Sequence, residues 1–195
     1  MNNYEGESVL ICFVYSVFEK KFFEHIICQL ESMNKNYWDK GKFKIIKICN
    51  SLGKLDIKYE FEKVIQKEKY SIESISVIYI YDKSYSLENK KYIKEQAKAE
   101  IEALKEEKKL KKLEFYEIDE TIEDLIKIDI KGVCDYLKIN FETIDFEPMS
   151  GYKTLEKLFE EKNKMYNRNK NTNMLKYINY ELILEGCKDK VNRIL

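Results

Sequence analysis

A series of short apolar runs, each followed by a segment with helical spacing, constrains the fold most strongly. The runs cover residues 9–15, 42–49 and 75–81, and a shorter one covers residues 114–118. The run at 9–15 has no polar residue, whereas the others carry lysine, serine or glutamate at some positions, and runs of this kind are typical of strands that are buried in a sheet. Strands that alternate with helices are joined by right-handed crossovers and run parallel. The sequence therefore predicts a three-layer α/β fold with a mostly parallel sheet of about four strands.

The segments between the runs place apolar residues at the spacing of one helix face. Phe18, Phe22, Ile26 and Leu30 form the first such stripe, each four residues after the last. We expect helices at four places, namely over residues 18–33, 56–69 and 87–113 and from residue 121 onward.

The C-terminal part of the chain has a different pattern. The only proline, Pro148, lies in a loop that precedes two short helical segments near 152–166 and 173–187. We therefore predict an α/β domain over residues 1–147 and a helical C-terminal segment over residues 148–195.

Composition excludes several classes of protein. The 35 Lys and Arg residues balance the 35 Asp and Glu residues, so no excess positive charge attracts nucleic acids or anionic membranes. No apolar run approaches the roughly 18 residues that span a bilayer, and no signal peptide is evident. Five scattered cysteines and the single His25 argue against disulfides and against a zinc site. We expect a cytoplasmic protein without a resident cofactor.

Asp82 is the first candidate for chemistry. It follows the apolar run at 75–81, and ligands of open α/β sheets gather at the carboxyl ends of the strands. The alternative is that Asp82 caps the turn that follows the strand.

The segment after the first predicted strand carries a family resemblance. Lys20, Lys21, Phe22 and Phe23 open a helix, with Glu19 as the acid before them. Together with an acid at the end of a later strand, this pattern resembles the toprim-like domains of topoisomerases, primases, OLD-family nucleases and small phage-defence or mobile-element proteins. The resemblance spans roughly residues 9–126.

In that family, carboxylates after the first and a later strand bind Mg²⁺, which promotes phosphodiester chemistry. The resemblance implies that Glu19 and Asp82 stand for two of these acids. The chain departs from the family pattern at two places. Tyr15 and Ser16 occupy the Glu-Gly positions, and Lys83 follows Asp82 where a second acid belongs. These departures favour a degenerate site that holds no metal.

An active site remains the alternative. Glu19 and Asp82 would then rebuild a Mg²⁺ site with a third acid, Asp119 or Glu123.

A segment rich in lysine and tyrosine near the C-terminus is the best candidate for contact with RNA, DNA or a partner protein, because phosphate attraction and aromatic stacking would act together there. Its candidate residues are Lys153, Lys157, Lys164, Tyr166, Arg168, Lys170 and Lys176. The alternative is an ordinary amphipathic hairpin with aromatic residues in the core and solvated lysines.

An acidic cluster offers a second contact surface. Its members are Glu114, Glu117, Asp119, Glu120, Glu123 and Asp124. It would dock a basic partner, or it would consist of solvated acids at the start of a helix.

These observations lead to three functional hypotheses. The first is a non-catalytic macromolecule-binding protein of a bacterial or phage mobile-element or defence setting, such as an inhibitor of a nucleic-acid-targeting complex. Its partner would be a protein or nucleoprotein complex, with RNA or DNA as a further candidate. The second is a Mg²⁺-dependent toprim-like nuclease. The third is an oligomeric scaffold assembled through exposed tyrosine and phenylalanine side chains.

Overall fold

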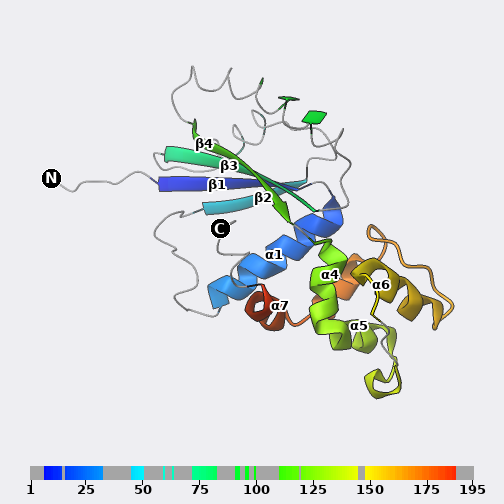
Figure 1. Cartoon of the computed structure of the whole chain (residues 1–195). Coiled ribbons are helices and arrows are strands. Elements are labelled where there is room, and N and C mark those ends of the chain that lie inside the picture. Colours follow the sequence, from blue (N-terminus) through cyan, green and yellow to red (C-terminus); the bar gives the residue numbers. More distant parts are fainter. Residues whose placement is uncertain are drawn as a thin grey trace. The chain divides into compact units, whose positions relative to one another are not determined.

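The computed structural model describes most of the strands and the C-terminal half of the chain (Figure 1). The described residues are 7–14, 16–32, 45–50, 59, 63, 72–82, 91, 92, 95, 96, 99, 110–118, 120–144 and 148–187. The helix predicted over 56–69 and most of the helix predicted over 87–113 lie outside them.

The chain forms two compact units that are each built from separate stretches of sequence. The first contains Met1–Ser16 and Asp39–Glu117, and the second contains Val17–Trp38 and Ile118–Leu195. These divisions cut the chain at other positions than the boundary predicted after residue 147.

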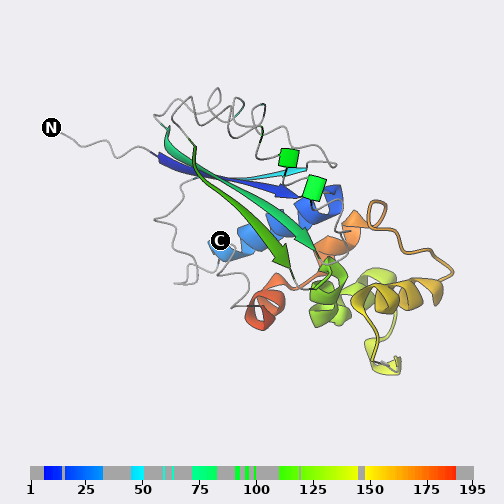
Figure 2. The ribbon, with the colours of Figure 1, turned by 45° about the horizontal axis from the view of Figure 1, so that its top comes forward.

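The first unit contains a sheet of four strands in the order β2-β1-β3-β4. The strands are β1 (Glu7–Val14), β2 (Ile45–Asn50), β3 (Ile72–Asp82) and β4 (Leu110–Ile118). β1 pairs in parallel with both β2 and β3. The arrows of β1, β3 and β4 run in the same sense in Figure 2. Each strand contains or adjoins one of the apolar runs in the sequence.

The register brings the ends of three strands to one edge of the sheet. Val14 of β1 lies opposite Asn50 of β2, and Phe13 lies opposite Tyr79 of β3. Asp82 follows three residues after Tyr79, so the end of β3 lies at the edge where β1 and β2 also end. Asp82 therefore has the backbone position that the sequence predicts, while its side chain lies outside the described set.

β4 corrects the end of one predicted helix. The helix expected over 87–113 cannot reach its predicted end, because β4 begins at Leu110. Lys112, Leu113, Glu114 and Phe115 alternate between polar and apolar side chains, which is the period of a strand. Pairing within the sheet outweighs the helical propensity of the lysines and glutamates.

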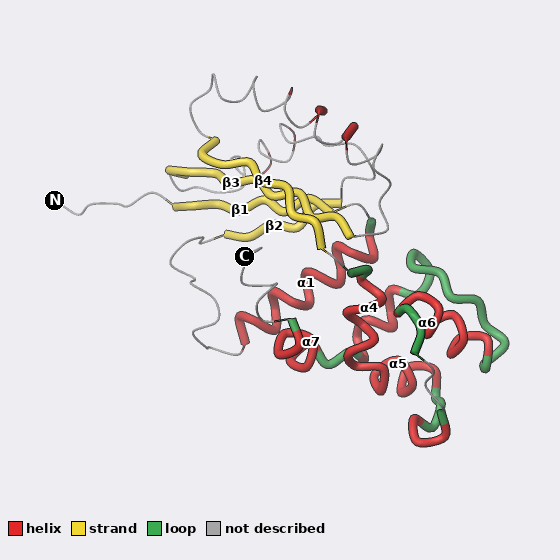
Figure 3. The backbone as a smooth tube through the Cα atoms, in the orientation of Figure 1, coloured by secondary structure: helices red, strands yellow, loops and turns green. Residues whose placement is uncertain are grey.

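The second unit is helical (Figure 3). Its α-helices are α1 (Val17–Ser32), α4 (Ile122–Ile126), α5 (Ile130–Leu137), α6 (Gly151–Glu160) and α7 (Tyr180–Gly186). Three 3₁₀ turns connect them, namely η1 (Lys127–Asp129), η2 (Phe141–Thr143) and η3 (Thr172–Tyr177).

The two C-terminal helices are shorter than predicted. The helix expected over 152–166 ends at Glu160, and Asn163 then adopts a left-handed backbone with φ of 52°. Asparagine tolerates this conformation better than most residues, so it ends the helical path. The helix expected over 173–187 divides into η3 and α7.

The helical unit has a core of its own. The predicted stripe of Phe18, Phe22, Ile26 and Leu30 is buried along α1. α1 contacts both η3 and α7, which follow it by about 150 residues in the chain. None of the helices in the described part of the chain is both long and apolar enough to cross a membrane.

The predicted three-layer α/β fold is wrong. The described residues outside the sheet are mainly helical and form a unit of their own, so the fold is not one three-layer sheet domain with a helical appendage. Moreover, α1 was expected to be a crossover helix of the sheet domain, but it is grouped with the C-terminal helices. The reason is that its apolar stripe is matched by aromatic and aliphatic side chains near the C-terminus, which sequence periodicity does not reveal.

Candidate functional site

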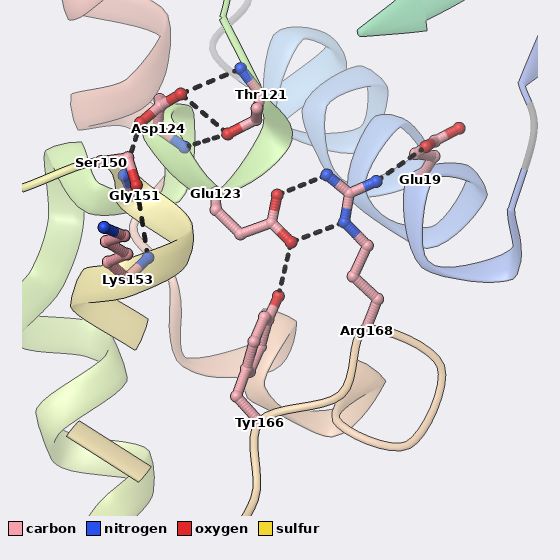
Figure 4. Close-up of polar contacts among 9 residues, drawn as sticks. All are labelled: Glu19, Thr121, Glu123, Asp124, Ser150, Gly151, Lys153, Tyr166 and Arg168. Carbon is pink, nitrogen blue, oxygen red and sulfur yellow. Dashed lines mark hydrogen bonds and ion pairs between the residues drawn. The ribbon is translucent and has the colours of Figure 1, made fainter. Parts of the chain in front are cut away.

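Two of the predicted catalytic acids meet on one arginine inside the helical unit (Figure 4). Glu123 of α4 accepts hydrogen bonds from Arg168 through both carboxylate oxygens, with Nε–Oε1 and Nη2–Oε2 distances of 2.5 Å. Glu19 of α1 accepts a longer bond from Arg168 Nη1, at 3.4 Å to its Oε1. A bidentate guanidinium–carboxylate pair is among the strongest polar contacts in proteins.

This cluster of Glu19, Glu123, Tyr166 and Arg168, which we call the buried ion cluster, is removed from solvent. Glu123 is 0% exposed, Glu19 is 2% exposed, and the Arg168 side chain is 23% exposed. Burying a charge costs several kcal/mol unless it is paired and hydrogen-bonded. The cluster therefore depends on having all of its members in place.

Tyr166 completes the hydrogen bonding of Glu123. Its hydroxyl donates to Glu123 Oε1 at 2.9 Å. Burial, and then the neighbouring Glu123 carboxylate, raise the pKa of Tyr166 well above its ordinary value. The ring packs edge-to-face against Tyr152 and Phe159 of α6, with centroids 5.5 and 5.3 Å apart. Tyr166 is thus a neutral donor that is held in place by aromatic packing.

A turn rich in asparagine positions Arg168. The backbone N–H of Asn167 donates to the side-chain oxygen of Asn171 at 2.7 Å, and the N–H of Asn171 donates back to the Asn167 carbonyl at 2.9 Å. The N–H of Lys170 also donates to the Asn167 carbonyl, at 3.1 Å. Asparagine side chains commonly stabilise such turns. The turn closes around Arg168 and so limits where its side chain can reach.

A second acid joins α4 to the start of α6. Thr121 and Asp124 form a capping box at the start of α4, and Asp124 Oδ1 also accepts from the N–H of Gly151 at 2.5 Å. Partial burial raises the pKa of Asp124, but the hydrogen bonds from Gly151 and Thr121 outweigh this effect and leave that pKa below its ordinary value. Asp124 is therefore a structural carboxylate.

Gly151 is required at this joint because the helices approach closely. A Cβ built on Gly151 would lie 2.2 Å from the carbonyl carbon of Glu123 and 2.3 Å from the backbone nitrogen of Asp124. No larger residue fits without moving α4, which carries Glu123.

The residues present do not fit the Mg²⁺ site that the family resemblance implies. A divalent ion needs several oxygen ligands, but Glu19 and Glu123 both direct oxygens at the Arg168 guanidinium, whose positive charge would repel the ion. Asp119 and the side chain of Asp82 lie outside the described residues. Among the residues that are described, no group of three or more His, Cys, Asp or Glu side chains is arranged to hold a metal.

The predicted partner-binding residues separate into two groups. Tyr166 is buried and Arg168 belongs to the buried ion cluster, so both act inside the helical unit. The lysines of the set lie on its surface, namely Lys153, Lys157, Lys164, Lys170 and Lys176. Large exposed side chains accompany them, with Met165 84% exposed and Tyr177 53% exposed.

The acidic cluster also separates. Glu123 is buried beside Arg168, and the partly buried Asp124 belongs to the capping box at the start of α4. Asp119 and the side chains of Glu114 and Glu117 lie outside the described residues.

Sequence reasoning missed the pairing of Arg168 with Glu19 and Glu123. One signal was present, because only two of the 35 basic residues are arginines, at positions 168 and 193. In a chain that otherwise uses lysine, an arginine indicates a position where the planar guanidinium is needed. Nothing in the sequence shows which acids it meets.

No protein-family model, curated protein or solved structure matches this chain.

Proposed function

We propose that this protein is a non-catalytic macromolecule-binding protein. The observation that carries the proposal is the engagement of Glu19 and Glu123 by Arg168. The nuclease hypothesis uses Glu19 and Asp82 as metal ligands with Asp119 or Glu123 as the third acid, whereas Glu19 and Glu123 here bond to an internal cation. The cluster serves to hold α1, α4 and the Asn-rich turn together.

The surface of the helical unit supplies the binding contacts in this proposal. Exposed lysines and exposed tyrosines lie together on elements that the buried core keeps rigid. Charged groups steer encounter, and exposed rings contribute contact area at low entropic cost. A protein or nucleoprotein complex is the expected kind of partner. Inhibition of a nucleic-acid-targeting complex in a mobile-element or defence setting is one role that such a surface would support.

A nuclease assay tests the non-catalytic part of the proposal. Purified protein is incubated with plasmid DNA and with RNA in the presence of Mg²⁺ or Mn²⁺, beside the variants Glu123→Gln and Asp82→Ala. We expect no metal-dependent cleavage above the level of the variants. Cleavage by the wild type that either substitution abolishes, while circular dichroism shows the variant to be folded, would show that the acid acts in catalysis.

A co-purification experiment tests the binding part. The tagged full chain and a variant with Lys153, Lys164 and Lys170 changed to glutamate are used to capture partners from native extract. We expect a defined protein or nucleoprotein partner that the charge-reversed variant loses. A variant with Lys131→Glu on α5 is the control, because Lys131 is exposed but already pairs with Asp135 at 2.8 Å.

A further inference from the structure

β4 is the outermost strand on one side of the sheet, and among the described strands only β3 adjoins it (Figure 2). It spans nine residues, Leu110–Ile118, and contains neither proline nor glycine. An outermost strand presents a row of backbone N–H and C=O groups along its outer edge, and a strand from another molecule can pair with them. The residues of β4 therefore decide whether this edge repels a second strand or selects one.

The charges of β4 are sorted by sign along the strand. Lys111 and Lys112 come near its start, and Glu114 and Glu117 follow toward its end. A second copy of β4 that ran parallel in the same register would place like charges side by side. An antiparallel copy instead places the basic half of each strand opposite the acidic half of the other. This antiparallel arrangement has a two-fold axis, so it closes as a dimer.

One antiparallel register matches the charges residue by residue. With Leu113 on the two-fold axis, Lys112 lies opposite Glu114 of the second copy, and the symmetry repeats this pair. Leu110 lies opposite Tyr116 of the second copy. Side chains alternate between the faces of a strand, so these residues share one face and Leu113 lies on the other. Opposite charges and apolar–aromatic pairs that face each other directly stabilise an antiparallel ladder.

The other side of the sheet does not have this pattern. β2 spans six residues, Ile45–Asn50, and its one charged residue is Lys47. Antiparallel pairing of β2 with a second β2 therefore provides no acid for this lysine. Pairing of β2 with β4 of another copy would be a head-to-tail contact, which has no two-fold axis. Charge complementarity thus favours the pairing of β4 with itself.

We propose that two copies of this protein pair through β4 in the antiparallel register centred on Leu113. Their two four-stranded sheets then join into one sheet of eight strands. The occupant of the edge is a second copy because both halves of the complementary pattern lie on the same strand. This inference goes beyond the proposed function and does not depend on it, since it uses the sheet unit and the proposed binding lysines lie on the helical unit.

Sedimentation velocity of the full chain at a series of micromolar concentrations tests the proposal. We expect a monomer–dimer equilibrium that high salt shifts toward the monomer. Lys112→Glu and Glu114→Lys should each weaken the dimer by about thirtyfold, because the symmetry makes both central pairs repulsive. The double variant Lys112→Glu/Glu114→Lys exchanges the charges without losing them, so it should restore the dimer.

A mixture of the two single variants gives a second, independent readout. Positions 112 and 114 are both acidic in Lys112→Glu and both basic in Glu114→Lys. We therefore expect the two variants to associate with each other, although neither associates with itself. Native mass spectrometry with a tag on one variant identifies the mixed dimer. Lys131→Glu, which reverses a charge on α5, is the matched control and should associate as the wild type does.

Hydrogen exchange locates the interface. Amides of β4 should exchange more slowly at concentrations where the dimer forms, and Lys112→Glu should lack this protection. Circular dichroism shows that each variant is folded before association is compared. The inference is overturned if the wild type stays monomeric throughout the micromolar range, if dimer formation leaves exchange of β4 unchanged, or if the mixed variants do not associate. Each of these results leaves the proposed function intact.

Discussion

Arg168 bonds to two carboxylates that have almost no access to water, so a single side chain supplies positive charge to both Glu19 and Glu123. Removing one partner of a buried ion pair destabilises a protein more than replacing both partners with apolar residues, because the remaining charge is left without compensation. We therefore expect the stability of this fold to be especially sensitive to substitution of this one residue.

Arg168→Met is expected to lower the free energy of unfolding by about 3 kcal/mol, because it leaves Glu19 and Glu123 buried without their cation. Arg168→Lys keeps the charge but loses the bidentate geometry, so its loss should be smaller. Urea unfolding monitored by circular dichroism measures both. Combining Arg168→Met with Glu123→Gln should recover part of the loss, since the second change removes one unpaired charge. A loss below about 0.5 kcal/mol for Arg168→Met would contradict the central place of the cluster.

Gly151→Ala is expected to destabilise the protein by about 2 kcal/mol or more, because the added methyl group would overlap the backbone of Glu123 and Asp124. Gly186→Ala is the matched control. The atoms nearest to its methyl group would all belong to the Ile128 side chain, with Cδ1 closest at 3.2 Å, and alanine favours the helical backbone. Thermal unfolding of the two variants gives the comparison. Equal melting temperatures would show that α4 and α6 do not approach each other as closely as described.

His25 gives the stability a defined dependence on pH. Its pKa in the folded protein lies below the ordinary value of 6.5, so the unfolded chain binds the proton more tightly. The stability contributed by the neutral ring is fully present above pH 6.5 and is lost as the pH falls through the lower, folded pKa. Urea midpoints measured at a series of pH values should decline over this window. In His25→Gln the decline within this window should disappear, while the acid unfolding associated with Asp124 below its ordinary pKa of 3.8 persists.

At the scale of elements, the short helices depend on their ends. α4 spans only Ile122–Ile126, too few residues to be stable alone, yet it carries Glu123. The Thr121 hydroxyl accepts from the N–H of Asp124 at 3.2 Å and donates to the Asp124 carboxylate at 2.8 Å. The cap fixes the point at which α4 begins and thereby the direction in which Glu123 points.

Thr121→Ala should cost about 1 kcal/mol in the free energy of unfolding, the usual effect of losing an N-cap side chain. Thr121→Ser keeps the hydroxyl and should retain most of the stability. Hydrogen exchange of the α4 amides provides the local measurement, with faster exchange expected in the alanine variant. Unchanged exchange in Thr121→Ala would mean that packing alone holds α4 in place.

The elements also show what a sequence can predict. The stripe of Phe18, Phe22, Ile26 and Leu30 identifies α1 because helical spacing is a local signal. The packing partner of that stripe cannot be found in this way, because Tyr180, which packs against Phe22 and His25, lies far from them in the sequence. The end of the helix predicted to reach residue 113 was misplaced for a related reason. Lysines and glutamates favour a helix locally, while pairing in the sheet decides otherwise for β4.

The candidate site was predictable in its members and not in its arrangement. The sequence predicted Glu19 and Glu123 as candidate metal ligands and Arg168 as a candidate contact with a partner. Their assignments to a metal site and to a partner surface came from a family pattern and from local charge. Contacts between residues 45 and 149 positions apart decide that they form one ion cluster, and no spacing rule encodes such contacts.

At the scale of the whole molecule, the chain passes between its two units more than once. Residues 17–38 leave the sheet unit to join the helical one, and the chain returns at residue 39 before leaving again after residue 117. Neither unit is a continuous segment. A cut at a single point in the chain therefore cannot separate them.

Truncation after residue 147 tests this organisation. The shortened chain would lack α6, η3 and α7, and with them Arg168 and Tyr180. We expect α1 to lose its packing partners and Glu19 and Glu123 to lose their cation, so that near-ultraviolet circular dichroism and cooperative unfolding are lost in the truncated chain. A truncation after residue 187 is the control and keeps every described helix. Native-like cooperative unfolding of the shorter chain would instead support an independent domain over residues 1–147.

The bond between Glu19 and Arg168 joins positions 149 residues apart, and this separation has a consequence for biosynthesis. A ribosome therefore delivers the acid 149 residues before it delivers the arginine. During that interval the apolar stripe of α1 has no packing partner near the C-terminus. Nascent chains with exposed apolar surface bind chaperones or aggregate. Slower translation between the codons for Glu19 and Arg168 would lengthen the time for which the stripe is exposed. Codon usage in that region should therefore influence the yield of folded protein.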